Sequence, residues 1–123
     1  MIKILLVDDY IELLDFFSVL LRDNGFDVKT ASTRKELNAQ MLLFVPDLII
    51  LDIMLKDEDG RDICREIKEK DNCIPIILLS ANPALLIDYQ DCYADDIIEK
   101  PFEIAEVVKK IKTILTKKEG IKI

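Results

Sequence analysis

The sequence predicts an α/β fold in which a parallel sheet carries helices on both faces. Two observations predict it. Short, continuous apolar runs alternate along the chain with stretches in which apolar residues recur every three or four positions, and there are five of each. The 123 residues fit the usual size of one domain, so we expect residues 1–123 to form a single unit.

The apolar runs have the character of strands that are buried on both faces, because most of them lack an alternation with polar residues. The run at 26–30 is weaker and is expected at an edge of the sheet. The predicted strands cover residues 2–7, 26–30, 47–51, 74–79 and 96–99.

The intervening stretches have helical spacing. In the first, Leu14, Phe17 and Leu21 fall on one face, and Gly25 is suited to the left-handed residue that ends a helix. The fourth is expected to begin at Pro83, with Asn82 as its cap. The predicted helices cover residues 10–24, 33–44, 61–70, a stretch from 83 onwards, and 102–117.

Composition narrows the range of partners. The formal charge is −7 and no continuous basic stripe offsets it, so we expect no nucleic-acid binding by this chain. The apolar run at 2–7 is too short for a signal peptide or membrane span, which favours a cytoplasmic protein without membrane attachment. The three cysteines are odd in number and widely spaced, so we expect buried, reduced thiols.

Polar residues follow four of the predicted strands. Asp8 and Asp9 come after the first strand, Asp52 after the third, Ser80 after the fourth and Lys100 after the fifth. Ligands of open α/β sheets bind at the carboxyl ends of the strands. We therefore expect three carboxylates, a hydroxyl and an ammonium group to share one edge of the sheet.

Such a cluster calls for a cation. Two carboxylates about 5 Å apart repel by roughly 3 kcal/mol at an effective dielectric constant near 20. Mg²⁺ fits best, because it takes oxygen ligands and the chain has no histidine to favour zinc. A carboxylate can also accept a phosphoryl group, and Asp52 is the best candidate nucleophile. Lys100 and Ser80 would then bind phosphoryl oxygens.

The sequence resembles the receiver domains of two-component response regulators over essentially its whole length. The resemblance implies a flavodoxin-like sheet with strand order 2-1-3-4-5. The segments that carry it, in order, are LLVDD at 5–9, PDLIILDIM at 46–54, DG at 59–60, PIILLSA at 75–81 and ADDIIEKPF at 94–102.

The resemblance also implies roles for single residues. Asp52 would be the phosphoacceptor, Asp9 a direct metal ligand, and Asp8 a ligand acting mainly through a metal-bound water. The backbone carbonyl of Met54 would supply another metal contact. Lys100 would precede a cis proline.

Ser80 would be the switch hydroxyl that moves toward the phosphoryl group. The phosphodonor would be a phosphohistidine on a sensor histidine kinase or a phosphotransfer protein. Phosphorylation would reshape the face formed by the helix from 83, the strand 96–99 and the helix 102–117, where an effector or a second copy of the chain would dock.

Three features depart from the family pattern and concern that face. Ile97 replaces a frequent aromatic residue, Tyr93 replaces a frequent glycine, and the interval from Ser80 to Lys100 is about two residues short. Two alternatives stay open. One is a degenerate receiver that only binds partners, and the other is a dehalogenase-type Mg²⁺-dependent phosphohydrolase. For the receiver we expect no turnover of a separate substrate.

Overall fold

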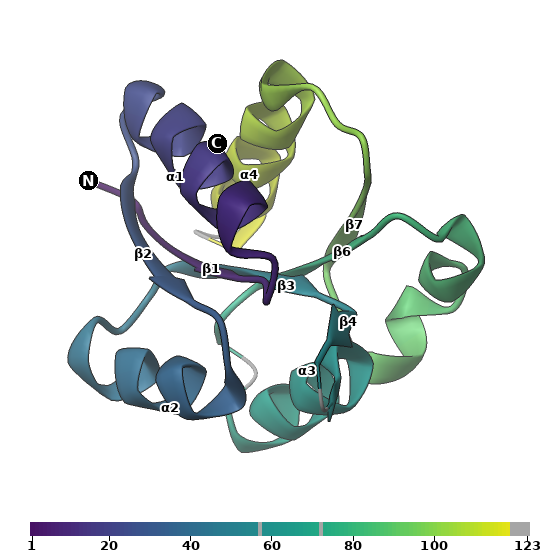
Figure 1. Ribbon diagram of the computed structural model, residues 1–123. Coiled ribbons are helices and arrows are strands. Elements are labelled where there is room, and N and C mark those ends of the chain that lie inside the picture. The colour runs from purple at the N-terminus through teal and green to yellow at the C-terminus, as the bar shows by residue number, and fades with distance from the viewer. Residues whose placement is uncertain (57, 72, 119–123) are drawn as a thin grey trace.

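The computed structural model describes residues 1–56, 58–71 and 73–118, and it contains a five-stranded parallel sheet (Figure 1). The strand order β2-β1-β3-β6-β7 corresponds to the expected 2-1-3-4-5, so the predicted fold class is confirmed. The strands of this sheet are β1 (Lys3–Val7), β2 (Asp27–Ala31), β3 (Leu48–Asp52), β6 (Ile76–Ser80) and β7 (Asp96–Glu99).

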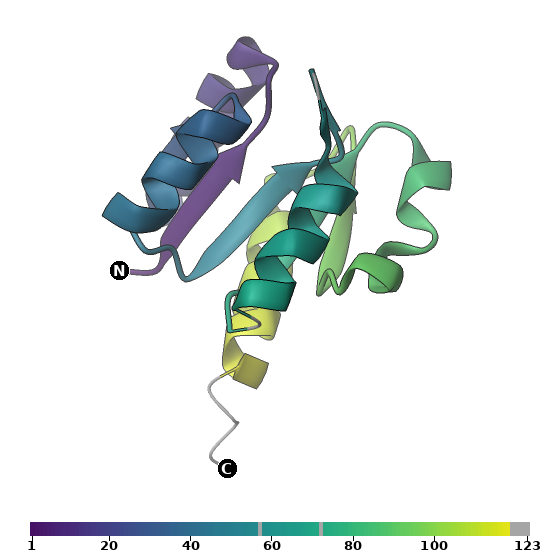
Figure 2. The same cartoon turned by 90° about the horizontal axis from the view of Figure 1, so that it is seen from below.

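Helices cover both faces of the sheet (Figures 1 and 2). On one face lie α1 (Ile11–Asp23) and α4 (Ile104–Lys118), and on the other lie α2 (Arg34–Leu43) and α3 (Gly60–Lys70). Strand side chains alternate between the two faces, as in β1, where Leu6 packs in the core with α1 and α4 and Leu5 packs in the opposite core. The sheet is therefore buried on both sides.

Local sequence signals fix the ends of the helices. Gly25 has a φ of 91° and follows α1, as predicted, with its N–H donating to the Arg22 carbonyl at 3.0 Å. The Thr33 hydroxyl caps α2 by accepting a hydrogen bond from the Glu36 N–H at 3.1 Å. Asp59 caps α3 by accepting from the Arg61 N–H at 2.8 Å.

The prediction of an α-helix that begins at Pro83 is wrong. Two 3₁₀ helices, η1 (Pro83–Leu86) and η2 (Tyr89–Cys92), occupy its place, although Asn82 caps η1 as expected. A 3₁₀ helix rises about 2.0 Å per residue against about 1.5 Å for an α-helix, so a shortened connection covers more distance in this form. Tyr93 then ends η2 in the left-handed region, with a φ of 68°, where the family often has glycine.

Two smaller features also differ from expectation. A hairpin of two-residue strands, β4 (Met54–Leu55) and β5 (Glu58–Asp59), follows β3 and was not predicted. Cys64 and Cys92 are buried, but Cys73 is exposed because it lies in the loop before β6, so the expectation of three buried thiols is wrong for that residue. All three cysteines are free thiols.

Among the residues that the structure describes, no helix combines the length and the apolar character needed to cross a membrane.

Candidate functional site

Four of the predicted site residues lie at the carboxyl edge of the sheet. Asp8 directly follows β1, Asp52 is the last residue of β3, Ser80 is the last residue of β6, and Lys100 follows β7. These strands are neighbours in the order β1-β3-β6-β7, so residues up to 92 positions apart in the chain meet at this edge.

The centre of the site is an ammonium group between two buried carboxylates. The Lys100 Nζ lies 2.7 Å from the Asp52 Oδ2 and 3.2 Å from the Asp8 Oδ2. Asp8 and Asp52 are only 1% and 4% exposed. Charges buried to this degree need partners, and a single lysine leaves this cluster with a formal surplus of one negative charge.

Backbone N–H groups hold the other carboxylate oxygens. The Asp8 Oδ1 accepts a hydrogen bond from the Tyr10 N–H at 3.0 Å, and the Asp52 Oδ1 accepts one from the Met54 N–H at 2.8 Å. Each carboxylate is therefore fixed by the chain that leaves its own strand. The Lys100–Pro101 peptide bond is cis, as the resemblance to receiver domains implied.

Burial governs the protonation of the cluster. Burial and, to a smaller degree, the charge of Asp52 raise the pKa of Asp8, the Tyr10 N–H and Lys100 lower it, and the net result is a pKa of about 6. Burial alone would lower the pKa of Lys100, but hydrogen bonds and charges from Asp52 and Asp8 outweigh it and raise the pKa above its usual value.

Ser80 is buried beside this cluster but makes no recorded contact with the carboxylates. Its hydroxyl accepts a hydrogen bond from the Asn82 N–H at 3.0 Å, and its carbonyl accepts one from the Lys100 N–H at 2.9 Å. The side chain is therefore joined to the start of η1, while the main chain is joined to the residue that bridges the two aspartates.

Two further predicted residues, Asp9 and Met54, directly follow the two aspartates in the chain or lie two positions beyond them. Asp9 is half-buried and lines a cavity of about 460 Å³ next to the β4–β5 hairpin, together with Arg34, Lys35 and Lys56. Met54 is exposed, and only its N–H has a recorded contact with the site. Within residues 1–56, 58–71 and 73–118, no group of three aspartate, glutamate, cysteine or histidine side chains is placed to hold a metal ion.

The donor atoms that are present nevertheless suit Mg²⁺. Mg²⁺ commonly binds to proteins through one or two carboxylates and keeps several waters. Asp8 and Asp52 supply two carboxylates, which are buried and face the same ammonium group. These two carboxylates therefore meet the number of protein ligands that Mg²⁺ commonly uses.

Gly60 is a site residue whose importance the sequence indicated only through the DG pair at 59–60. A Cβ atom at this position would lie 2.2 Å from the Asp52 carbonyl oxygen and 2.8 Å from the Ile53 Cα. The Gly60 N–H also donates to the Ile53 carbonyl at 2.6 Å. The first residue of α3 must lack a side chain because the backbone of the candidate phosphoacceptor passes against it.

An apolar groove of about 450 Å³ opens beside Lys100, between α1 and the start of α4. The ring centroids of Phe17, in α1, and Phe102, which precedes α4, lie 4.4 Å apart. The apolar lining of the groove consists of Leu13, Phe16, Leu20, Ala81, Pro101, Phe102 and Ile104. A protein or peptide that approaches Asp52 from this side would meet an apolar surface.

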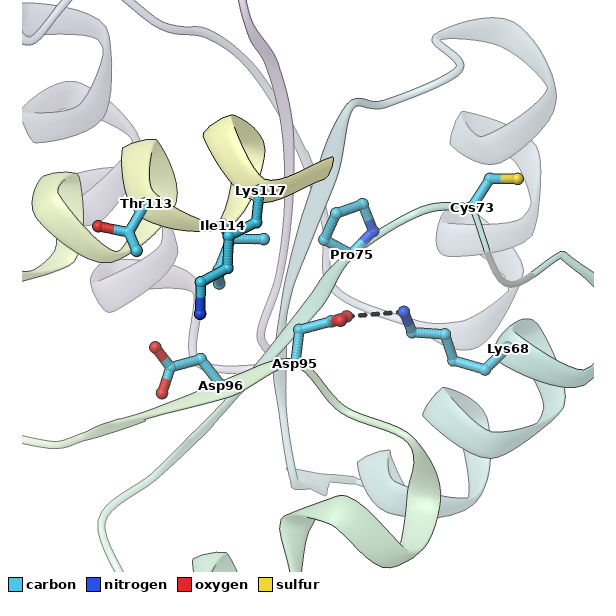
Figure 3. A pocket seen from close by; sticks show the side chains of 8 residues that line it. All are labelled: Lys68, Cys73, Pro75, Asp95, Asp96, Thr113, Ile114 and Lys117. Atoms are coloured by element: carbon cyan, nitrogen blue, oxygen red, sulfur yellow. Dashed lines mark hydrogen bonds and ion pairs between the residues drawn. The ribbon is translucent and has the colours of Figure 1, made fainter. Parts of the chain in front are cut away.

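A second polar region lies at the opposite end of the sheet, where β6 and β7 begin (Figure 3). There the Lys68 Nζ lies 2.6 Å from the Asp95 Oδ2, which also accepts a hydrogen bond from the Ile76 N–H at 2.8 Å. Both groups line a cavity of about 420 Å³ together with Cys73, Asp96 and Lys117. This ion pair fixes the end of α3 to the sheet. It is separate from the carboxyl edge that holds Asp8, Asp52 and Lys100, which we call the acidic edge.

The fold and the acidic edge together define a flavodoxin-like α/β domain with a buried carboxylate pair bridged by lysine. The sequence matches the family described as the response regulator receiver domain over residues 4–112. The chain belongs to this family and is a receiver domain of two-component response regulators.

Curated relatives and solved structures agree with this assignment. The chain is 34% identical over 116 residues to the transcriptional regulatory protein TrcR of Mycobacterium tuberculosis, covering 93% of this chain and 45% of that protein. It is 34% identical over 119 residues to the alkaline phosphatase synthesis transcriptional regulatory protein PhoP of Bacillus subtilis, covering 95% and 50%. The chain thus spans about half the length of the curated relatives it matches.

The structural similarity covers nearly all of the chain. A receiver domain protein from Clostridium thermocellum matches with a TM-score of 0.89 and 26% identity, covering 97% of this chain and 98% of that one. A CheY-like receiver domain protein from Methanospirillum hungatei matches with a TM-score of 0.87 and 25% identity, covering 98% of both chains.

Proposed function

We propose that residues 1–123 form one phosphoacceptor domain of a two-component phosphorelay, in which Asp52 accepts a phosphoryl group in a Mg²⁺-dependent reaction. The observation that carries the proposal is the position of Asp52. It is a buried carboxylate at the end of the central strand, with the Lys100 ammonium 2.7 Å from its Oδ2. The phosphodonor would be a phosphohistidine on a sensor histidine kinase or phosphotransfer protein of the cytoplasm.

In this reaction an oxygen of Asp52 bonds to phosphorus as the phosphorus–nitrogen bond to histidine breaks, and the imidazole leaves. The product is an acyl phosphate. Charge develops on the phosphoryl oxygens, so the residues around Asp52 act mainly by positioning and neutralising charge. Lys100 is already in place to do this, and the Ser80 hydroxyl would reach a phosphoryl oxygen after leaving the Asn82 N–H.

Asp8, Asp9 and Asp52, with the Met54 carbonyl, are the groups proposed to hold Mg²⁺. When bound, the metal would neutralise charge shared by these carboxylates and the incoming phosphoryl oxygens. Asp8 and Asp52 already face the same ammonium, which supports their part in this set. Met54 is an exposed residue beside Asp52, and its N–H already donates to the Asp52 Oδ1, which supports its place in this set.

The signal would be a shift of the segment that follows Ser80. When the Ser80 hydroxyl leaves the Asn82 N–H, the start of η1 loses one of its anchors. The face that we propose to respond consists of η1, η2, β7 and α4, in place of the longer helix expected in this position. An effector or a second copy of the chain would dock there.

The test is to incubate the protein with Mg²⁺ and acetyl phosphate and to measure its intact mass. We expect one added phosphoryl group, which is absent in Asp52→Asn and present in Asp23→Asn, a control at an exposed aspartate of α1. Absence of any adduct, or an adduct that persists in Asp52→Asn, would overturn the proposal and favour the degenerate receiver. Steady turnover of phosphate esters would favour the phosphohydrolase.

A further inference from the structure

Two buried cysteines lie against each other at the contact between α3 and η2. Cys64, in α3, is 0% exposed, and Cys92, in η2, is 2% exposed. The Cys64 thiol donates a hydrogen bond to the Cys92 carbonyl at 3.3 Å, and the Cys92 thiol donates one to the Tyr89 carbonyl at 3.2 Å. The two residues are 28 positions apart, so this contact is made by the fold.

The two side chains also act on each other. Burial raises the pKa of the Cys64 thiol, and the charge and hydrogen bonding of the Cys92 thiol raise it further. The hydrogen bond from the Cys64 thiol to the Cys92 carbonyl places the two residues in direct contact. Both thiols donate to backbone carbonyl oxygens, whereas the carboxylate site is formed by Asp8, Asp52 and Lys100.

We propose that Cys64 and Cys92 form an oxidation site in which a peroxide closes a reversible disulfide between α3 and η2. Cys73 has no role in it, because it is exposed in the loop before β6.

The chemistry needs only the two thiols and hydrogen peroxide. The thiolate of one cysteine attacks the O–O bond and becomes a sulfenic acid, while the released hydroxide takes up a proton to form water. The second cysteine then attacks that sulfur, a sulfur–sulfur bond forms, and a second water leaves. Two thiols and one peroxide thus give one disulfide and two waters, with the thiols oxidised and the peroxide reduced.

Access to the buried sulfur depends on η2. This element is a four-residue 3₁₀ helix, and such short helices have weaker hydrogen-bond geometry than an α-helix. It lies between Asp88 and Tyr93, both of which are exposed. Local opening of η2 would bring the Cys92 thiol to solvent, and so to peroxide, without unfolding the sheet.

The disulfide would restrain the segment through which we propose that the receiver signals. Cys92 is the last residue of η2, and the segment from Pro83 to Cys92 connects Ser80 to β7. A covalent bond from Cys92 to α3 would hold the far end of this segment when Ser80 moves. This consequence rests on the proposed function, whereas the disulfide itself does not.

The experiment uses the full chain, reduced and then treated with hydrogen peroxide at neutral pH. Remaining thiols are blocked with N-ethylmaleimide, and the intact mass and a non-reducing peptide digest are recorded. In a Cys73→Ser background we expect a mass loss of two hydrogen atoms, no maleimide adduct, and a linked peptide pair containing Cys64 and Cys92. Dithiothreitol should restore the mass and both maleimide sites.

Three outcomes would overturn the inference. Peroxide could convert the cysteines separately to sulfinic acids, or it could leave both thiols unreacted, so that N-ethylmaleimide labels them once the protein is unfolded. In the wild type, the disulfide could instead include Cys73. Cys64→Ser and Cys92→Ser in the same background should each lose the disulfide. Because the wild-type digest identifies the linkage directly, the test does not depend on those variants folding.

A second measurement separates this inference from the proposed function. In reduced protein, acetyl phosphate and Mg²⁺ should increase hydrogen exchange in residues 83–92, and the oxidised protein should lose this increase. If neither form is phosphorylated at Asp52, the proposed function fails. If the oxidised form is phosphorylated and its exchange rises as in reduced protein, the restraining effect of the disulfide is refuted.

Discussion

The Lys100 Nζ and the Asp52 Oδ2 lie 2.7 Å apart although 48 positions separate the two residues in the chain. The same ammonium lies 3.2 Å from the Asp8 Oδ2, so one lysine neutralises part of the charge on two strands. This arrangement makes Lys100 a structural residue of the metal-free domain in addition to the role proposed for it in phosphoryl transfer.

Lys100→Met should therefore destabilise the metal-free protein. Two buried carboxylates would lose their shared partner, and we expect the free energy of unfolding at neutral pH to fall by about 2 kcal/mol. Urea denaturation in the presence of a chelator measures it, and added Mg²⁺ should recover part of the loss. Lys109→Met, at an exposed lysine of α4, is the control and should cost less than about 0.5 kcal/mol. Equal losses in the two variants would contradict the prediction.

Asp8→Asn should stabilise the metal-free protein in a pH-dependent way. The pKa of Asp8 is about 6 in the folded protein against an ordinary value of 3.8, so the folded state holds the proton more tightly than the unfolded chain. The free energy of unfolding of the wild type should thus fall as pH rises between these values. Asp8→Asn should lack this fall and be more stable by about 3 kcal/mol above pH 6.

The control for that variant is Asp23→Asn, which changes an exposed aspartate and should keep the wild-type pH profile. Denaturation curves recorded in a chelator across the same pH range provide the comparison. If Asp8→Asn and the wild type keep a constant difference in stability from acid to neutral pH, Asp8 does not titrate as described.

Gly60→Ala should disturb both stability and phosphorylation. The added methyl group would meet the Asp52 carbonyl oxygen at 2.2 Å, so the backbone of β3 or α3 must move. Overpacking of this kind costs about 1–3 kcal/mol. We expect a lower melting temperature and slower labelling by acetyl phosphate. Asp62→Ala, at an exposed position in the same first turn, serves as the control, and a Gly60→Ala protein that behaves like it would refute the prediction.

Val45→Asn should stabilise the protein. Val45 has a φ of 50° and precedes Pro46, a combination that is unfavourable for a β-branched residue. Its side chain is 59% exposed, so little packing is lost on replacement. Asparagine tolerates the left-handed region better, and we expect a gain of about 1 kcal/mol. The control, Leu43→Asn, removes an exposed apolar side chain in α2; a similar gain there would show that backbone strain is not the cause.

Lys68→Met should reveal the cost of breaking the ion pair at the opposite end of the sheet. The Lys68 side chain is 4% exposed, but Asp95 is about one-third exposed and keeps its bond from the Ile76 N–H. Water can therefore reach the Asp95 carboxylate after its partner is removed, and we expect the free energy of unfolding to fall by about 1 kcal/mol. Combining Lys68→Met with Asp95→Asn should cost less than the sum of the two single changes. Lys70→Met, at an exposed neighbour, is the control.

The sheet could be predicted from the sequence because its strands are buried on both faces and their apolar runs have no other simple interpretation. β3 and β6 are buried at every position, and the predicted bounds of both differ from the structure by one or two residues. Helices α1 and α4 were equally clear, because Phe17 and Val107 belong to continuous apolar faces.

The connection from Ser80 to β7 could not be predicted in the same way. Asn82 and Pro83 mark a helix start correctly, but the apolar spacing of Leu86, Tyr89 and Cys92 suits an α-helix and a pair of 3₁₀ turns alike. Only the short interval to Lys100 indicated a difference, and it did not specify the form. The β4–β5 hairpin was missed because two-residue strands leave no periodic pattern.

The candidate site shows the same limit at the scale of single side chains. The rule that ligands bind at the carboxyl ends of strands led to Asp8, Asp52 and Lys100, and the structure brings these three together. Asp9 follows Asp8 directly, but Lys100 pairs with Asp8 and Asp52, and Asp9 lines the cavity beside the β4–β5 hairpin. Sequence order places a residue at an edge, but the direction of its side chain depends on the local turn.

The course of α4 has a practical consequence for studying this receiver. The helix starts beside Lys100 and runs for 15 residues toward the end of the sheet where Lys117 lines the cavity with Asp95 (Figures 2 and 3). Thr116, exposed on its last turn, is therefore remote from the acidic edge. A dye or a biosensor tether attached at Thr116 would leave the edge that holds Asp52 and Lys100 free for the proposed phosphodonor.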